Sequence, residues 1–318
     1  MRPPDFWKRR DWRSRLVAPL GWFYGASVAW KAVHAKPFQP GVAVVCVGNL
    51  GVGGTGKTPI AIEIARVLAA RGHKPFFLTR GFGGRLRGPI EATQDDRAVD
   101  VGDEAILLAC AAPTIVARDR REGAKLAFGR GADTIVMDDG HQNFALAKDL
   151  SLVIVDGEAG FGNGHVIPAG PLREPVQQGL ARADAVIVVG EGTPPLAGFS
   201  RPVLRAHLTL EDADIAGRRM VAFAGIGRPG KFFQSLVNLG ANLLATQGFA
   251  DHHAYSAGEI ARLRAKARTL NAELVTTEKD FVRLTRTERE GIRAMPVRAV
   301  FDDMAALDRL LDSLPSKR

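Results

Sequence analysis

Residues 42–68 read VAVVCVGNLGVGGTGKTPIAIEIARVL, and this stretch decides the fold of the chain. An apolar, β-branched run over Val42–Val47 is followed by a glycine-rich loop, and then by apolar residues at helical spacing from about Thr58 to Arg71. This order predicts a buried strand, a tight loop and a helix packed on the strand, which is the first βα unit of an α/β domain. The loop, Gly51–Thr58, satisfies the pattern GxxxxGK(S/T) of a phosphate-binding P-loop.

Loops of this kind bind phosphate groups through backbone N–H groups at the start of a helix. We therefore expect the Lys57 ammonium to reach the β and γ phosphates of a nucleotide and the Thr58 hydroxyl to ligate Mg²⁺. The same glycines also fit the dinucleotide pattern GxGxxG, but the Lys-Thr pair favours the P-loop. The predicted nucleotide-binding residues are Gly51, Gly53, Gly54, Thr55, Gly56, Lys57 and Thr58.

Apolar runs alternate with helical segments as far as about residue 190. This alternation predicts a P-loop NTPase-like, mostly parallel sheet flanked by helices. Gly and Pro are frequent over residues 190–202, which marks a plausible boundary, and a second α/β set follows. We therefore expect three parts: an N-terminal helix over residues 1–35, a P-loop domain over residues 36–200 and a smaller α/β domain over residues 201–318.

The first 30 residues differ in composition from the rest. All four tryptophans of the chain lie there: Trp7, Trp12, Trp22 and Trp30. Four further apolar residues fall on one helical stripe, after a cluster of basic residues: Leu16, Leu20, Phe23 and Tyr24. The pattern favours an amphipathic helix that lies in an anionic membrane interface. Two alternatives are a stripe that packs on the protein's own core and a secretory signal. The uncharged stretch over residues 16–30 is too short to span a bilayer, so no transmembrane helix is predicted.

The charge balance favours anionic partners. Lys and Arg number 43 against 34 Asp and Glu, which gives a net charge of +9 and fits phosphates, acidic lipid surfaces or nucleic acid. Hydrophobic residues at 46% and charged residues at 24% exclude a collagen, a long coiled coil or a wholly disordered chain. The two cysteines, Cys46 and Cys110, form no CxxC pair, so neither a zinc site nor a redox motif is indicated, and a reducing compartment fits.

Two aspartates, Asp138 and Asp139, follow a predicted strand over Thr134–Met137. A P-loop site needs a carboxylate at the end of a neighbouring strand to hold the metal or its water. The pair stands 80 residues after Thr58, which leaves room for intervening βα units. We therefore predict that it lies at the metal, with a simple turn and helix cap as the alternative.

Three other polar stretches are suggestive. Arg80–Arg85 follows a predicted strand and could present arginines to a phosphate, or form a surface loop. Asp100–Glu104 places carboxylates before a helix, where capping is the alternative. His252 and His253 precede a capping box, and a solvated pair is the alternative because too few further ligands are spaced for zinc.

In this order, these stretches resemble the tetraacyldisaccharide 4'-kinase family of lipid A biosynthesis. The likeness spans nearly the whole chain. The matching segments are VGNLGVGGTGKTP (Val47–Pro59), TRGFGG (Thr79–Gly84), VGDE (Val101–Glu104), DDGHQN (Asp138–Asn143), PAGPLREP (Pro168–Pro175), FADHHAY (Phe249–Tyr255) and TTEKD (Thr276–Asp280). The chain departs from the family's usual residues at Phe82, His141 and Asn143, and we consider whether His141 replaces the missing histidine.

The resemblance implies transfer of the γ-phosphate of ATP to the 4'-hydroxyl of a lipid disaccharide 1-phosphate, at the inner face of the cytoplasmic membrane. It implies that Asp103 is the catalytic base, paired with His252. Mg²⁺ would be served by Thr58, Glu104 and Asp138. The residues near the sugar, its phosphate and the lipid's other anionic groups would be Arg80, Arg120, Asp139, Gln142, Arg173 and Glu174. The implied partners are the lipid and the anionic membrane surface. We also expect the chain to act as a monomer.

Other functions are also considered. One is a P-loop phosphotransferase for a soluble small molecule, which the tryptophan-rich N-terminus disfavours. Another is a membrane-associated nucleotide switch, which is weakened because the chain has no NKxD guanine-specificity motif. A nucleic-acid binder is the least favoured, because the basic excess stands beside aromatic residues at the N-terminus rather than in a recognised reading module.

Overall fold

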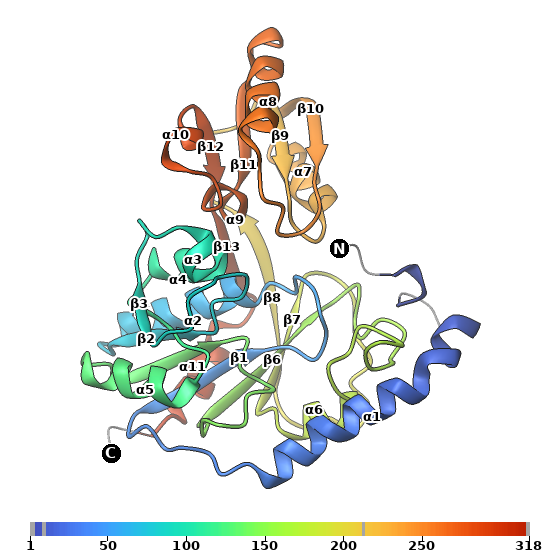
Figure 1. The fold of residues 1–318 in the computed structure, drawn as a ribbon, viewed down its shortest axis with the longest axis vertical. Coiled ribbons are helices and arrows are strands. Elements are labelled where there is room, and N and C mark those ends of the chain that lie inside the picture. Colours follow the sequence, from blue (N-terminus) through green and yellow to red (C-terminus); the bar gives the residue numbers. More distant parts are fainter. Residues whose placement is uncertain (1–3, 8–10, 212–213, 316–318) are drawn as a thin grey trace.

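The computed structural model describes residues 4–7, 11–211 and 214–315, and the strands within them form two sheets (Figure 1). The larger sheet contains β1 (Ala43–Gly48), β2 (Pro75–Thr79), β3 (Ile90–Ala92), β4 (Thr114–Val116), β5 (Thr134–Asp138), β6 (Leu150–Asp156), β7 (Ala185–Val189), β8 (Val203–Leu210) and β13 (Val297–Phe301). The smaller sheet contains β9 (Arg219–Ala224), β10 (Asn242–Gly248), β11 (Glu273–Thr277) and β12 (Ile292–Met295). The larger sheet with its helices is called the large unit, and the smaller sheet with its helices is called the small unit.

The large sheet has the strand order β13-β8-β7-β6-β1-β5-β2-β4-β3. Neighbouring strands are parallel except at the two edges, where β3 pairs with β4 and β13 with β8 in antiparallel fashion. The predicted mostly parallel sheet is therefore confirmed. Alternate residues of β1 enter two different cores: Val45 and Val47 pack on one face, and Val44 and Cys46 on the other.

Helices cover both faces of this sheet, which explains why its central strands are continuous apolar runs. The helices of the first face are α2 (Lys57–Ala70), α4 (Asp103–Ala109) and α11 (Met304–Asp312). Those of the second face are α5 (Arg120–Gly129) and α6 (Val176–Ala181). Two short helical segments, η1 (Asp5–Trp7) and α3 (Ala98–Val101), lie outside these layers.

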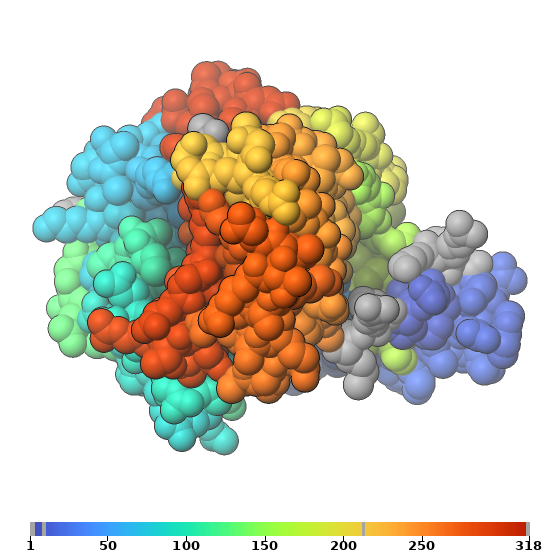
Figure 2. Space-filling view, turned by 90° about the horizontal axis from the view of Figure 1, so that it is seen from above, coloured from blue at the N-terminus to red at the C-terminus, as the bar shows by residue number. Residues whose placement is uncertain are grey.

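The small sheet has the order β10-β9-β11-β12, and all its pairs are parallel. Its faces are covered by α7 (Pro229–Asn238) and α8 (Ala257–Thr269), and β11 continues into α9 (Glu278–Phe281) and α10 (Arg286–Arg289). The predicted smaller α/β unit is confirmed. Figure 1 shows it standing above the large sheet, and Figure 2 shows it seated over the middle of the large unit.

The division between the two sheets does not fall at the predicted boundary of residue 200. The strand β8 and, after the whole small unit, β13 and α11 belong to the large sheet, where β8 pairs with β7 and β13 pairs with β8. Leu307 and Leu311 of α11 complete the core formed with α2. The Gly- and Pro-rich stretch is therefore only the connection from β7 to β8, and the small unit is inserted between two strands of the large sheet.

The N-terminal segment contains one long helix, α1 (Trp12–His34), which a capping box of Asp11 and Ser14 opens. Its small residues face the protein: a Cβ at Gly21 would lie 2.7 Å from the carbonyl oxygen of Val166, and one at Gly25 would lie 3.4 Å from Pro175. The helix is thus seated on the Val166–Pro175 loop, and Figure 1 shows it running past α6 on the outside of the large unit.

The predicted apolar stripe of α1 faces away from the protein. Leu16 is 72% exposed and Phe23 77% exposed, and Leu20 and Tyr24 are exposed as well. The alternative in which this stripe packs on the protein's own core is therefore wrong. Among the described helices, none is both long and apolar enough to cross a bilayer.

Candidate active site between the two units

The glycine-rich loop connects β1 to α2. Its place is fixed by the start of α2 and by a hydrogen bond to a neighbouring segment. The helix begins at Lys57, and Gly53 and Gly56 have φ angles of 121° and 85°, which side-chain-bearing residues rarely adopt. The loop is also hydrogen-bonded to the segment that contains PAGPLREP: the Val52 N–H donates to the Pro171 carbonyl (2.8 Å). The P-loop and this segment therefore form one preassembled surface.

Asp138 ends β5 beside Val47 of β1, so it stands at the base of the P-loop. Thr58 Oγ1 donates to Asp138 Oδ2 at 3.2 Å, whereas the buried Oδ1 has no hydrogen-bond partner among the described residues. Burial, together with the negative charge of Glu104, raises the pKa of Asp138 to about 7. A buried carboxylate oxygen without a partner fits a cation.

No group of three or more His, Cys, Asp or Glu side chains in the described ranges is arranged to hold a metal by itself. Mg²⁺ is commonly bound by one or two carboxylates together with phosphate oxygens and water. The donors here, Thr58, Asp138 and Glu104, suit that kind of site, which a bound nucleotide would complete.

Asp139 forms the centre of a second cluster. Its backbone has a φ of 52°, and Arg173 donates to both of its carboxylate oxygens, at 2.8 and 2.9 Å. Lys57 Nζ lies 3.8 Å from Oδ1. Burial alone would raise the pKa of Asp139, but the charges of Lys57 and Arg173 lower it below its usual value. The predicted P-loop lysine and two predicted substrate residues are thus brought together.

Glu174 lies beneath this cluster and is almost fully buried. It accepts hydrogen bonds from Gln142 Nε2 (2.9 Å) and from Arg182 (2.5 Å), and the Gln142 amide also donates to the Asn49 carbonyl (2.8 Å). These contacts indicate that Glu174 fixes the Gln142 side chain beside the P-loop.

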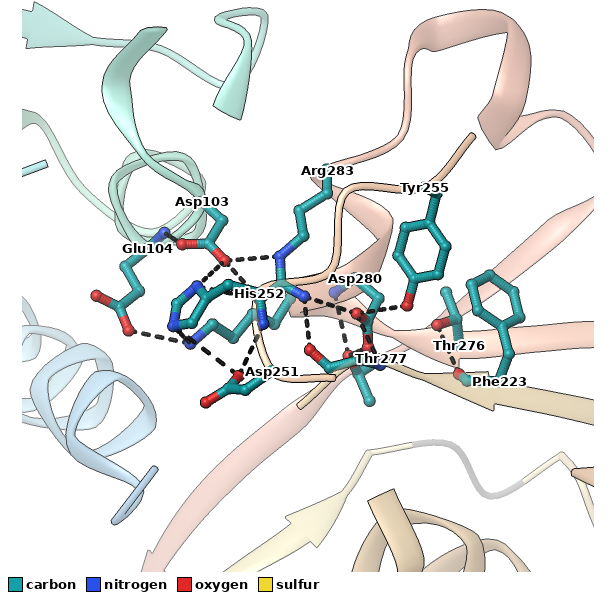
Figure 3. A network of polar contacts seen from close by, with 12 residues as sticks. Asp103, Glu104, Phe223, Asp251, His252, Tyr255, Thr276, Thr277, Asp280 and Arg283 are labelled. Atoms are coloured by element: carbon teal, nitrogen blue, oxygen red, sulfur yellow. Dashed lines mark hydrogen bonds and ion pairs between the residues drawn. The ribbon is translucent and has the colours of Figure 1, made fainter. Parts of the chain in front are cut away.

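Asp103 and His252 meet across the boundary between the units (Figure 3). Asp103 is the first residue of α4 in the large unit, and His252 lies in the loop between β10 and α8 of the small unit. His252 Nδ1 is 3.0 Å from Asp103 Oδ2. The predicted pair is therefore assembled although its members are 149 residues apart.

Two further cations of the small unit reach the same carboxylates. Arg283 Nε donates to Asp103 Oδ2 at 2.7 Å, and Lys279 Nζ donates to Glu104 at 3.1 Å. Burial alone would raise the pKa of Asp103, but the hydrogen bond with His252 and the two positive charges hold it well below its usual range. Sequence reasoning missed both cations. The TTEKD motif, which contains Lys279, was the one available signal.

The two predicted arginines, Arg80 and Arg120, lie in different surroundings. Arg120 begins α5 and is only 3% exposed, and its Nε has no hydrogen-bond partner within the described part of the chain. Burial lowers the pKa of Arg120 to about 10. Arg80 is exposed in the loop after β2.

His141 packs in the core, with its Nε2 3.0 Å from the Gly179 carbonyl. Its ring therefore faces the protein interior and not the Asp139 cluster.

The small unit also touches the P-loop itself. A Cβ built at Gly227, in the loop after β9, would lie 3.9 Å from the Gly54 nitrogen and 3.6 Å from Asp251 Oδ2. One region therefore contains the P-loop, the carboxylates of Asp138 and Asp139, and the pair of Asp103 and His252. A nucleotide phosphate, a metal and a hydroxyl substrate could meet there.

Comparisons with known proteins identify the family and the fold of this chain. The sequence profile of the family described as tetraacyldisaccharide-1-P 4'-kinase matches residues 13–315. The chain is 50% identical to the tetraacyldisaccharide 4'-kinase of Paramagnetospirillum magneticum and 48% identical to that of Dinoroseobacter shibae, over 99% of this chain and 99% and 98% of those chains. The crystal structure of LpxK from Aquifex aeolicus in complex with ATP has the same fold, with a TM-score of 0.75 and 24% identity over 94% of this chain and 98% of that one. The chain belongs to the tetraacyldisaccharide-1-P 4'-kinase family.

Proposed function

We propose that this chain transfers the γ-phosphate of ATP to the 4'-hydroxyl of a tetraacylated glucosamine disaccharide 1-phosphate, with Asp103 as the base. Family membership carries the reaction. The observation that supports the site is the meeting of the Asp103–His252 pair with a P-loop and a partnerless Asp138 oxygen in one region.

The large unit binds the nucleotide. Backbone N–H groups of the P-loop surround the phosphates, and Lys57 at the start of α2 places a positive charge next to them. Thr58, Asp138 and Glu104 would hold Mg²⁺, which would supply charge neutralisation for the phosphoryl transfer. Lys279 Nζ donates to Glu104 (3.1 Å) and so fixes this carboxylate at the start of α4.

The small unit completes the base. Asp103 Oδ2 is occupied by His252 and Arg283, whereas Oδ1 accepts only the Glu104 backbone N–H (2.9 Å) among the described contacts. Oδ1 therefore has a lone pair for the 4'-hydroxyl proton. As Asp103 takes this proton, the sugar oxygen forms a bond to the γ-phosphorus and the bond from that phosphorus to the leaving ADP oxygen breaks.

The remaining polar groups recognise the lipid head. Arg173 and Arg80 supply positive charge for the 1-phosphate and other anionic groups, and Arg120 adds its charge from its buried place at the start of α5. Asp139 presents carboxylate acceptors to sugar hydroxyls beside the P-loop. Both N–H donors of the Gln142 amide are used by the Asn49 carbonyl and Glu174, so Gln142 meets the sugar through its carbonyl oxygen. Glu174 acts through Gln142, because its own carboxylate is buried.

The helix α1 places the enzyme at an anionic membrane surface, the cytoplasmic face of the inner membrane, as a peripheral or monotopic protein. Large apolar side chains are exposed along its whole length. They are Trp12, Leu16, Leu20, Trp22, Phe23, Tyr24, Trp30 and Val33. An exposed apolar surface of this extent is typical of a lipid-interface helix. Since one chain supplies every site residue, we propose that it acts as a monomer.

The reaction is tested by transfer of label from γ-³²P-ATP to the tetraacylated disaccharide 1-phosphate in detergent micelles. We expect labelled lipid from the parent, and about 10²-fold less or lower from Asp103→Ala and His252→Ala. His73→Ala is the matched control, because its Nδ1 lies 3.6 Å from Asp133 in a similar pair remote from the P-loop. ATP binding without any labelled lipid would contradict the substrate, and full activity of Asp103→Ala would contradict the base.

A further inference from the structure

The segment that follows β11 sends two cations, Lys279 and Arg283, to carboxylates of the large unit. We propose that Arg283 is a positioning residue that fixes the Asp103 carboxylate across the boundary between the units. This role rests on the proposed function of Asp103 as the base. It assigns a purpose to the TTEKD motif, whose last residue anchors Arg283.

Arg283 is itself held rigidly by the small unit. Asp280 is fully buried and accepts hydrogen bonds from Tyr255 Oη (2.8 Å), from the Gly225 N–H (3.0 Å) and from the Thr277 hydroxyl (2.6 Å). Arg283 Nη1 donates to this carboxylate (2.8 Å) and to the Gly225 carbonyl (2.7 Å). One side of the guanidinium is therefore fixed to the core of the small sheet (Figure 3).

The opposite side of the guanidinium holds Asp103. Nε lies 2.7 Å and Nη2 2.5 Å from Asp103 Oδ2, and the two side chains are 7% and 5% exposed. A planar guanidinium fixes the direction as well as the distance of its partner, which an ammonium does not. Both donors contact the same oxygen, Oδ2, while Oδ1 accepts the Glu104 backbone N–H (2.9 Å). Together these contacts fix the orientation of the carboxylate and leave a lone pair of Oδ1 for the hydroxyl.

The donors of Arg283 are nearly all used. Both contacts of Nη1 go to the small unit, and Nε and Nη2 contact Asp103. Little donor capacity is left for a phosphate or a sugar, so these contacts favour positioning over direct substrate binding. Lys279, four residues earlier, reaches the adjacent carboxylate of Glu104. One short segment thus holds two neighbouring carboxylates at the start of α4.

The test uses the full chain with Arg283→Gln and Arg283→Lys, each alone and combined with Asp103→Ala. We expect Arg283→Gln to lower kcat by about 10²-fold, while KM for ATP and for lipid changes by less than about 3-fold. Arg283→Lys keeps the charge without the fork and restores only part of the rate. In the Asp103→Ala background, Arg283→Gln should have almost no further effect, because it acts through the residue already removed.

Arg289→Gln is the matched control. Arg289 donates to the carbonyl groups of Phe281, Val282 and Leu284, so it supports the same segment without contact to Asp103. The kcat of Arg289→Gln should stay near the parent's. Thermal unfolding should show that Arg283→Gln and Arg289→Gln both fold. A rise in KM for ATP at unchanged kcat would overturn positioning in favour of phosphate binding, as would equal losses in the parent and Asp103→Ala backgrounds. If Asp103→Ala itself kept full activity, the proposed base would fall instead.

Discussion

Two carboxylate clusters flank the P-loop, and they take their partners from different parts of the chain. Asp139 is paired with Arg173, and both belong to the large unit. Asp103 also belongs to the large unit, but its partners His252 and Arg283 come from the small unit. The Asp139 cluster is therefore built by one unit alone, whereas the base is complete only when both units are in place.

The largest effect is expected from the P-loop of the large unit. Lys57→Ala removes the charge that stands at the P-loop and beside Asp139, and we expect kcat/KM to fall by about 10³-fold. The measurement is steady-state transfer of labelled phosphate to the lipid. The exposed Lys125→Ala, which loses only a contact with Glu122 and one with the Phe38 ring, is the control. If Lys57→Ala kept parental activity, the large unit would not bind the phosphates as we describe.

The second effect concerns stability in the small unit. Asp280→Ala leaves Arg283, Tyr255 and the Gly225 N–H without their buried partner, and breaking a buried pair costs about 3 kcal/mol of unfolding free energy. Asp139→Ala should cost about 1 kcal/mol or less, because its side chain is 32% exposed. Urea unfolding of both full-length variants compares them directly. If Asp280→Ala and Asp139→Ala lost equal amounts of unfolding free energy, the two carboxylates would not differ in their contribution to stability.

The third effect is a pH dependence in the large unit. Burial, together with the nearby charges of Lys148 and Arg182, lowers the pKa of His141 from 6.5 to about 3. A lowered pKa means that the stability from neutral His141 is present above pH 6.5 and is lost as the pH falls. Between about pH 7.5 and 5 the parent should lose about 2 kcal/mol of unfolding free energy more than His141→Gln. Parallel pH profiles would contradict this.

The local parts of the fold could be predicted from the sequence. The β1 strand, the P-loop and α2 follow from a continuous pattern of apolar, glycine and helical residues, and the exposed stripe of α1 follows from its spacing. The last two strands on one side of the sheet, β8 and β13, could not. β8 carries polar residues such as Arg205 and His207, and β13 pairs with it only after the whole small unit has been traversed. Nothing in the local pattern reveals that return to the large sheet.

The candidate site divides in the same way. Asp138 and Asp139 could be predicted because a buried strand ends at them, next to the strand before the P-loop. Arg283 could not, because its partner Asp103 is 180 residues away and no spacing links the two. The pairing of Asp103 with His252 came from the family resemblance and not from any local pattern. Contacts between units are set by tertiary structure, which a single sequence does not display.

The smallest effect separates membrane docking from both clusters. Phe23→Ser removes an outward side chain of α1 that touches neither cluster, so binding to anionic vesicles should weaken by about 10-fold. Activity on lipid in detergent micelles should stay near the parent's. Gly21→Val is the inward counterpart: its new side chain would meet the Val166 carbonyl, in the loop that leads to Arg173. Gly21→Val should lose activity on lipid in micelles while the exposed stripe of α1 stays intact. Vesicle sedimentation and the activity assay in micelles together distinguish Gly21→Val from Phe23→Ser. If Phe23→Ser lost micellar activity as strongly as Gly21→Val, α1 would serve the site and not the membrane.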